Sequence, residues 1–213
     1  MFKFDKLVFG DLGWGDEFLF ATLMTITVSI LSMGLGLCLA ILTVWAKLIT
    51  NKITRLIANF YTTVVRGVPE LLVIYLIFFG GNTVVMSIAK LFGYNGYIEL
   101  NALTIGTIAI AFISATYSSE VLRAAYLAVN KGQIEAAKAL GLNKFQIFFK
   151  VMGPQILRHA LPGIGNVWQI TLKDTSLISV TGLVEIMRQT RISSNVEHSP
   201  LTFLVTAALL YLF

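Results

Sequence analysis

Four ionisable side chains lie within stretches of the chain that are otherwise apolar. Arg66 and Glu70 interrupt residues 56–80, and Lys173 and Asp174 follow one another in a later apolar stretch. Because an ionised group at membrane depth is costly, such residues usually pair with one another or line a wet cavity. Two interpretations therefore stand, salt bridges between helices and a path for a polar solute. Arg66 has a third, since a long basic side chain near a membrane surface can extend to the headgroups.

Polar residues beside these charges leave similar alternatives open. Pro69 has no backbone donor, so it either breaks the helix and exposes polar backbone toward a cavity, or only kinks it. Hydroxyl residues follow Asp174, where they can contact a solute, form a gate or pack against other helices. An acidic wall of Glu70 or Asp174 would favour a cationic solute. The candidate substrate path or gate consists of Arg66, Pro69, Glu70, Lys173, Asp174, Thr175, Ser176 and Ser179.

No catalytic, metal or nucleotide site is predicted. His159 and His198 are isolated, and neither has a second histidine or a cysteine at ligand spacing. The sequence also lacks the pattern G-x-x-x-x-G-K-[ST] of a phosphate-binding loop. We therefore expect that the chain is not an enzyme and binds no cofactor itself.

The composition indicates that lipid surrounds much of the chain. Of its 213 residues, 56% are hydrophobic and 13% are charged, against about 25% charged in an average soluble domain. A soluble protein of this length would need a more polar surface. The net charge of +5 does not indicate nucleic-acid binding, because the basic residues are not gathered with aromatic residues on one polar face.

The apolar stretches predict an all-α integral membrane protein with five transmembrane helices. The first is uncharged for 29 residues, and as a helix it would exceed a hydrocarbon core of about 30 Å. The last is too short to span, so we expect the natural chain to continue past Phe213 and complete the fifth helix. The expected spans are residues 18–46, 56–80, 100–119, about 159–184, and a stretch that begins at Pro200.

The distribution of charge predicts an orientation. Residues 120–158 carry six basic and two acidic side chains, which makes this loop between the third and fourth helices cytoplasmic by the positive-inside rule. The N-terminus, residues 81–99 and residues 185–199 are then outside. Residues 81–99 contain turn signals, although residues 84–92 could form a short interfacial helix. The whole chain, residues 1–213, is treated as a single membrane domain.

The cytoplasmic loop, residues 126–158, is predicted to contain two short helices. Ile134, Ala137 and Leu140 recur at helical spacing, and Gly141 then ends the first helix. The second is expected to end at Gly153 and Pro154. Such a loop either rests on lipid headgroups or forms a docking surface for another protein. The apolar face expected for the second helix consists of Leu142, Phe145, Phe148, Phe149 and Met152.

The same loop resembles the "EAA" loop of the permeases of ATP-binding cassette importers. That pattern is EAA, three residues, Gly, nine residues and I-x-L-P. Here Glu135, Ala136 and Ala137 are followed by Gly141 and by residues 151–154, where Val151 replaces the usual Ile and Gly153 the usual Leu. Four segments further resemble permeases for polar amino acids, of the histidine, lysine-arginine-ornithine or opine type. They are RGVPELL (66–72), KGQIEAAKALGL (131–142), LPGIGN (161–166) and LKDTSLISVTGLVE (172–185).

The resemblance implies a function and a set of partners. The chain would be a multi-pass permease subunit of the bacterial inner membrane that translocates polar, most readily basic, amino acids or opines. It would work with a periplasmic or surface solute-binding protein, a second permease subunit, identical or different, and a cytoplasmic ATPase dimer that holds ATP and Mg²⁺. No nucleic acid is implied. The residues that would dock the ATPase are Glu135, Ala136, Ala137, Lys138, Gly141 and Leu142.

Two other functions are compatible with a membrane protein of this size. A self-sufficient secondary transporter or channel would usually need more spans, internal symmetry or a continuous pore lining in one chain. A membrane scaffold without a transport role would use the cytoplasmic loop only as a binding surface. The charges within the apolar stretches and Pro69 argue against the scaffold.

Overall fold

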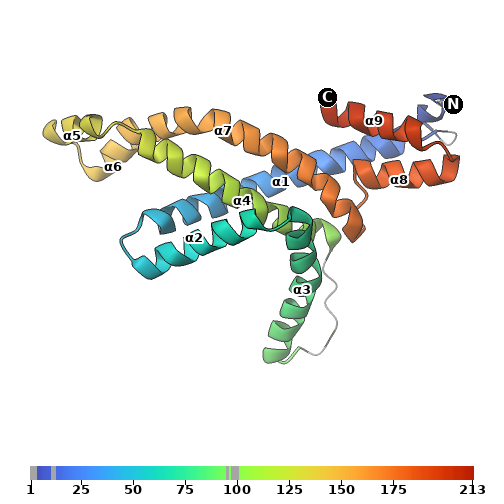
Figure 1. Ribbon diagram of the computed structural model, residues 1–213, viewed down its shortest axis with the longest axis horizontal. Helices are drawn as coiled ribbons and strands as arrows, with labels where there is room; N and C mark the ends of the chain where they lie inside the picture. Colours follow the sequence, from blue (N-terminus) through green and yellow to red (C-terminus); the bar gives the residue numbers. More distant parts are fainter. Residues whose placement is uncertain (1–3, 11–12, 95, 97–100) are drawn as a thin grey trace. The chain divides into compact units, whose positions relative to one another are not determined.

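Every element of secondary structure in the described part of the chain is helical (Figure 1). The computed structural model describes residues 4–10, 13–94, 96 and 101–213. The expected all-α fold is confirmed, whereas the number of spans and their orientation stay predictions. In chain order the elements are η1 (Phe4–Leu7), α1 (Gly15–Leu48), α2 (Lys52–Gly67), α3 (Glu70–Leu91), α4 (Ala102–Ala128), α5 (Lys131–Ala139), α6 (Lys144–Ile147), η2 (Phe148–Met152), α7 (Gly153–Asp174), η3 (Thr175–Thr181), α8 (Ile186–Glu197) and α9 (Pro200–Leu212).

The chain forms two compact units. The first, unit 1, comprises Met1–Ser32, Pro69–Ile110 and Thr171–Phe213, and the second, unit 2, comprises Met33–Val68 and Ala111–Ile170. The long helices α1, α4 and α7 contribute residues to both. A single domain over the whole chain stays a prediction.

Three helices in the described residues are long and apolar enough to cross a membrane, namely α1, α3 and α4. α1 and α4 correspond to the first and third expected spans. α7 is long enough to cross a membrane but carries too many polar residues to be counted with these three helices. α9 is a shorter apolar helix of 13 residues. The sequence and the structure therefore agree most closely where the apolar stretch carries no charge.

The second expected span is divided in the structure. α2 ends at Gly67, Val68 and Pro69 are extended, and α3 begins at Glu70. Proline disfavours helical geometry in the residue before it, which explains why Val68 leaves the helix. Of the two interpretations of Pro69, the break of the helix is confirmed and the simple kink is wrong, whereas exposure of polar backbone toward a cavity stays a prediction.

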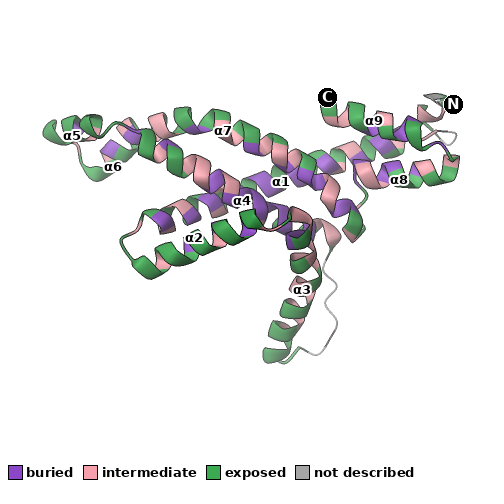
Figure 2. Ribbon diagram, viewed as in Figure 1, coloured by how far each residue is buried: buried purple, intermediate pink, exposed green. Residues whose placement is uncertain are grey.

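α3 extends further than the turn signals predicted. Gly80, Gly81 and Asn82 lie inside the helix, which continues to Leu91. Backbone groups in lipid must find hydrogen-bond partners within the helix, so glycines that would form a turn in water remain helical in an apolar segment. Most of α3 is not buried, as Figure 2 shows, and its apolar side chains suit contact with lipid or with another subunit.

Unit 1 has a small apolar core to which three helices contribute. Val28 of α1, Ile110 of α4 and Ile178 of η3 are fully buried there. A Cβ atom on Gly106 would lie 2.7 Å from Cγ2 of Ile178, so the glycine allows η3 to approach α4 closely. η3 thereby packs against a membrane helix although it is irregular.

Residues 185–199 form a capped helix in unit 1 rather than a simple loop. The Glu185 carboxylate accepts hydrogen bonds from the backbone N–H groups of Met187 (2.9 Å) and Arg188 (2.8 Å) at the start of α8. α8 packs along α9 (Figure 1). A carboxylate at a helix N-terminus both caps free donors and complements the helix dipole.

Close helix contacts also build unit 2. A Cβ on Gly36 of α1 would lie 2.2 Å from the hydroxyl of Ser114 on α4, and one on Gly163 of α7 would lie 2.6 Å from Val121 on α4. Small residues at such contacts let membrane helices approach by van der Waals packing. α4 is therefore packed closely against both α1 and α7 within this unit.

The first half of the cytoplasmic loop forms as expected. Asn130 caps α5 by accepting a hydrogen bond from the Gly132 N–H at 2.8 Å. The helix ends at Ala139, and Gly141 follows with a φ of +77°. Glycine is the residue that adopts this left-handed conformation most easily, which explains the helix stop.

The second half of the loop differs from the expected helix. α6 has only four residues and leads into the π-helical turn η2. Met152 is buried, whereas the three phenylalanines of the expected apolar face are exposed. The three phenylalanines contact one another, so they do share a face, whereas the inclusion of Met152 in that exposed face is wrong, because the wider π turn changes the phase of the side chains. The exposed residues are Phe145, Phe148 and Phe149.

Gly153 and Pro154 do not end this helix, contrary to the prediction. Both lie in the first turn of α7, where a proline is tolerated because the first N–H groups of a helix have no partner within it. α7 therefore starts before residue 159, continues through Pro162 and ends at Asp174. The fourth expected span consists of α7 followed by η3, and Gly182 closes η3 with a φ of +103°.

Candidate functional site

The residues expected to dock an ATPase do not all lie on the surface of the loop. Glu135, Ala136, Lys138 and Gly141 are exposed. Ala137 is buried in a cluster with Val129, Ile147 and Met152, against which Leu142 packs. The cluster fixes α5 relative to η2, so Ala137 and Leu142 hold the loop together rather than present a surface.

Exposed apolar side chains surround Gly141. Leu140 is 80% exposed and Phe145 is 70% exposed, and α5 and α6 are largely exposed in Figure 2. Phe145 and Phe149 form an aromatic pair with ring centroids 4.3 Å apart. Contiguous exposed apolar residues usually mark a site of contact with a protein or a membrane.

The structure brings two of the candidate substrate-path residues together in unit 1. The carboxyl groups of Glu70, at the start of α3, and Asp174, at the end of α7, lie within hydrogen-bonding reach of each other. Asp174 is buried and Lys173 beside it is exposed. Two carboxylates this close repel each other when both are ionised, so a cation between them would be stabilised.

The hydroxyl residues after Asp174 belong to η3. Thr175 and Ser179 are buried, and Ser176 is half-buried. The Thr175 hydroxyl donates to the backbone oxygen of Leu172 at 2.7 Å, and the backbone oxygen of Ser179 accepts a hydrogen bond from Arg188 at 3.1 Å. These contacts hold the irregular turn, which suits a gate or a packing role more than a free hydroxyl surface.

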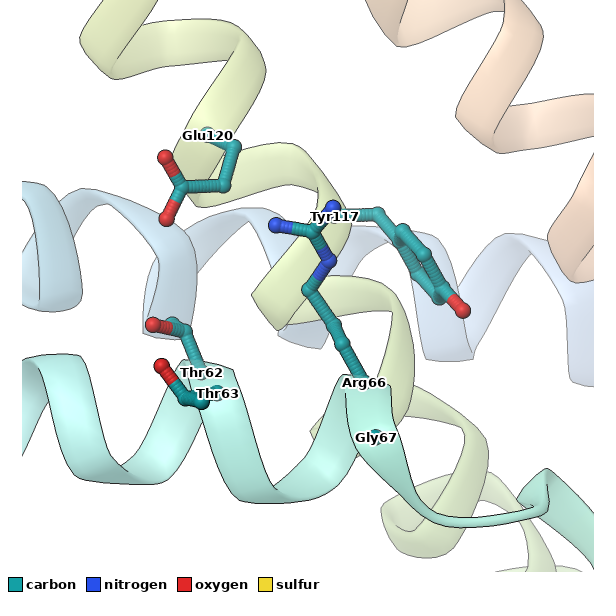
Figure 3. Close-up of a pocket in the computed structure, with 6 residues that line it drawn as sticks. All are labelled: Thr62, Thr63, Arg66, Gly67, Tyr117 and Glu120. Atoms are coloured by element: carbon teal, nitrogen blue, oxygen red, sulfur yellow. The ribbon is translucent and has the colours of Figure 1, made fainter.

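Arg66, the remaining charged candidate, lies in unit 2 at a separate pocket between α2 and α4. Figure 3 shows its side chain extending from α2 toward Tyr117 and Glu120 on α4. Its guanidinium carbon is 5.6 Å from the centre of the Tyr117 ring. The pocket has a volume of about 380 Å³ and is lined by Thr62, Thr63, Arg66, Gly67, Tyr117 and Glu120.

An ion pair with one buried partner lies beside this pocket. The Lys47 ammonium on α1 donates to the Glu120 carboxylate and, at 2.7 Å, to the hydroxyl of Thr62. Arg123 is 3.9 Å from the second oxygen of Glu120. Sequence reasoning missed this network, although a signal was present. Lys47 and Glu120 each follow an uncharged stretch directly, and the expected topology ends both stretches at the same membrane surface.

No metal centre was expected, and within the ranges that the structure describes no group of three His, Cys, Asp or Glu side chains is suited to hold an ion. Apart from this, the described residues offer three candidate sites, which are the Glu70 and Asp174 pair, the Arg66 pocket and the exposed surface around Gly141.

Comparison with known proteins identifies the family. Residues 32–213 match the family model described as "Binding-protein-dependent transport system inner membrane component". The chain belongs to this family. The resemblance seen in residues 135–154 is thereby confirmed, and the chain is a permease component of a transport system.

Members of this family with a named solute are similar over nearly the whole chain. The nopaline transport system permease protein of Agrobacterium fabrum is 50% identical over 207 residues, which cover 97% of this chain and 88% of that protein. The histidine/lysine/arginine/ornithine transport system permease protein of Escherichia coli is 36% identical over 200 residues, which cover 94% of this chain and 87% of that protein.

The fold is also similar to that of a solved member of the amino acid transporters. A crystal structure described as an amino acid ABC transporter with histidines superposes with a TM-score of 0.78 at 29% identity. The match covers 93% of this chain and 87% of that chain. Sequence and structure therefore agree that this is a permease of the ATP-binding cassette type.

Proposed function

We propose that this chain is the permease subunit of an ATP-driven importer for basic amino acids or opines. The observation that carries the proposal is the similarity, over almost the full chain, to permeases named for nopaline and for histidine, lysine, arginine and ornithine. Binding-protein dependence of the family supports delivery of the solute by a solute-binding protein.

The pair of carboxyl groups in unit 1 supports a cationic solute. Glu70 and Asp174 face each other where α3 begins and α7 ends. A lysine, arginine or histidine side chain would interact favourably with both carboxylates and relieve their repulsion. η3 follows directly, so Thr175, Ser176 and Ser179 belong to the gate beside this cation site.

Three partners follow from the proposed function. A cytoplasmic ATPase dimer binds ATP and Mg²⁺ and supplies the energy, since this sequence has no phosphate-binding loop. A second permease subunit, either another copy or a different chain, completes the path. A periplasmic or surface solute-binding protein loads it, and the complex resides in the bacterial inner membrane.

The exposed part of α5 is the proposed entry point for the motion of the ATPase. Glu135 is exposed on α5 and is available to a basic group of the partner. An interfacial charge pair that loses one member after desolvation weakens binding by about 2–5 kcal/mol. Gly141 contributes through geometry, because its left-handed backbone ends α5 and leaves the surface open at that point.

Reconstitution tests the proposal. The chain is purified with the ATPase and permease encoded beside it, placed in liposomes and supplied with the neighbouring solute-binding protein loaded with arginine, histidine or nopaline. ATP hydrolysis is expected to rise with the loaded binding protein, with solute uptake alongside it. Uptake that persists without any ATPase would favour a secondary transporter, and binding of partners without uptake would favour a scaffold.

Two variants test the docking surface in the same assay. Glu135→Lys and Gly141→Asp are expected to leave the chain in the membrane but to uncouple ATP hydrolysis from uptake. The control is Gln133→Lys, which adds a cation two residues away, on the opposite side of α5 at 100° per residue. Normal uptake in both variants would contradict the docking role of α5.

A further inference from the structure

The pocket between α2 and α4 has the size and the enclosing groups of a small-ligand site. Its volume is about 380 Å³, within the range of about 300–1,000 Å³ typical of ligand pockets. It contains one guanidinium, two threonine hydroxyls, a tyrosine ring and a carboxylate. It is distinct from the pair of acidic residues in unit 1, since all six lining residues belong to unit 2.

Arg66 is held in a position to bind an anion. Its guanidinium carbon lies 5.6 Å from the centre of the Tyr117 ring, and such a cation–π contact is an attraction to the ring face rather than a hydrogen bond. Within the described residues Arg66 has no hydrogen bond or ion pair with another side chain. Planar N–H donors of arginine match a carboxylate in a bidentate manner.

The charge around the pocket also favours an anionic group. Glu120 is the acidic residue of the lining, but Lys47 binds it directly and Arg123 lies 3.9 Å from it. With Arg66 there are three basic side chains against one acidic side chain. The surplus of positive charge is exposed to the pocket through Arg66, because the Lys47 side chain is only 3% exposed.

The two threonines of the pocket differ in how accessible their hydroxyls are. The Thr62 hydroxyl is already engaged, since it accepts from Lys47 and lies 3.2 Å from the backbone oxygens of Ala58 and Asn59. Thr63 is exposed and also lines the pocket. Figure 3 shows the two threonines one turn before Arg66 on the same helix.

We propose that this pocket binds the carboxylate of the transported solute, with Arg66 as the charged donor and Thr63 as a hydroxyl donor. The inference rests on the proposed function, because a carboxylate is the group that amino acids and opines share. A lipid phosphate offers the same oxyanion chemistry, so the experiment must separate a solute carboxylate from a lipid headgroup.

The test measures binding of labelled L-arginine to the assembled transporter in phosphatidylcholine nanodiscs. Unlabelled L-arginine competes with it, as do L-argininamide and agmatine, in which the carboxylate is neutralised or absent. The wild type is expected to prefer L-arginine by about tenfold or more, as is usual for a hydrogen bond between charged groups. Arg66→Gln is expected to lose this preference and to bind L-arginine about as weakly as L-argininamide.

Two further variants make the result specific. Arg66→Lys keeps the positive charge but lacks the planar guanidinium group. Its preference for L-arginine over L-argininamide is expected to lie between those of the wild type and of Arg66→Gln. Arg55→Gln is the control, because 11 residues of α-helix are about three turns, which puts Arg55 on the same face of α2 away from the pocket. It is expected to keep the wild-type preference. Assembly of each variant is checked by gel filtration.

The outcomes separate this inference from the proposed function. An unchanged preference in Arg66→Gln, in a complex that still imports arginine, would overturn the carboxylate site. A preference that depends on added phosphatidylglycerol rather than on the solute carboxylate would also overturn it, in favour of a lipid headgroup. Loss of import in the wild type, with the binding preference intact, would count against the proposed function alone. Absence of binding for L-arginine, L-histidine and nopaline would overturn both.

Discussion

The ammonium of Lys47 on α1 forms an ion pair with the carboxylate of Glu120 on α4, 73 residues away in the sequence. The two partners differ in their surroundings. The Lys47 side chain is 3% exposed, whereas that of Glu120 is 33% exposed and lies near a second cation, Arg123. Removing one partner therefore has a different consequence from removing the other.

Glu120→Gln is expected to destabilise the subunit more than Lys47→Met. The first change leaves a buried ammonium without its counter-charge, which costs several kcal/mol, up to about 3–5 when a pair is fully buried. The second removes the buried charge and leaves a carboxylate that still contacts Arg123 and solvent. The midpoint of thermal unfolding of the purified complex measures the difference, and equal shifts for both variants would contradict the argument.

Glu185→Gln is expected to loosen the start of α8. One carboxylate oxygen accepts from Arg188 N–H and the other accepts from Met187 N–H and from the Tyr211 hydroxyl at 2.9 Å. An amide offers one oxygen and turns an NH₂ group toward a donor, and an unsatisfied buried donor costs about 1–3 kcal/mol. Tyr211→Phe keeps the cap and should cost about 0.5–1.5 kcal/mol.

Hydrogen exchange of residues 186–190 measures this effect. Exchange in that segment should rise for Glu185→Gln and remain near the wild-type rate for Tyr211→Phe. Faster exchange of equal size in both variants would show that the hydroxyl, rather than the helix cap, dominates.

Gly106→Ala is expected to push η3 away from α4. The added Cβ would lie 2.7 Å from Cγ2 of Ile178, which is fully buried. Overpacking of this kind costs about 1–3 kcal/mol. Ile178→Ala removes the clashing atoms, so the double variant should be more stable than the sum of the two single effects predicts. Strict additivity in the thermal midpoints would argue that the two residues do not contact each other.

The elements that sequence predicted best are those governed by a single strong preference. α1 and α4 follow uncharged apolar stretches, and the break before α3 follows from the steric effect of Pro69 on Val68. The stop of α5 follows from Gly141 in the same way. In each case one local property outweighs the rest, so no knowledge of distant contacts is needed.

The features that sequence predicted poorly depend on competition between local signals and surroundings. Gly81 and Asn82 read as turn signals, but an apolar environment favours the helix. Met152 was grouped with the exposed phenylalanines on one face, but it is buried because a π turn changes the helical phase. Arg66 was grouped with Glu70 because both interrupt the same apolar stretch, yet the break at Pro69 separates them into different helices.

Variants of Gly141 separate the fold of the loop from docking. A φ of +77° is tolerated by asparagine and aspartate but is strained for valine, at about 1–2 kcal/mol or more. No neighbouring atom lies within 4 Å of a Cβ at this position, so a side chain would extend from the surface without a clash inside the chain. Gly141→Asn and Gly141→Asp should thus preserve the loop, whereas Gly141→Val should loosen it.

Coupling is expected to fail in all three variants, because each puts a side chain on the surface that the ATPase would cover. Hydrogen exchange of residues 137–142 reports the loop, and ATP-driven uptake reports the coupling. Slow exchange together with lost uptake in Gly141→Asn would support contact with the ATPase at this glycine, since the backbone is then intact. Uptake that falls only as exchange rises, from Asn through Asp to Val, would mean that Gly141 acts by holding the loop together and that the ATPase contacts another part of α5.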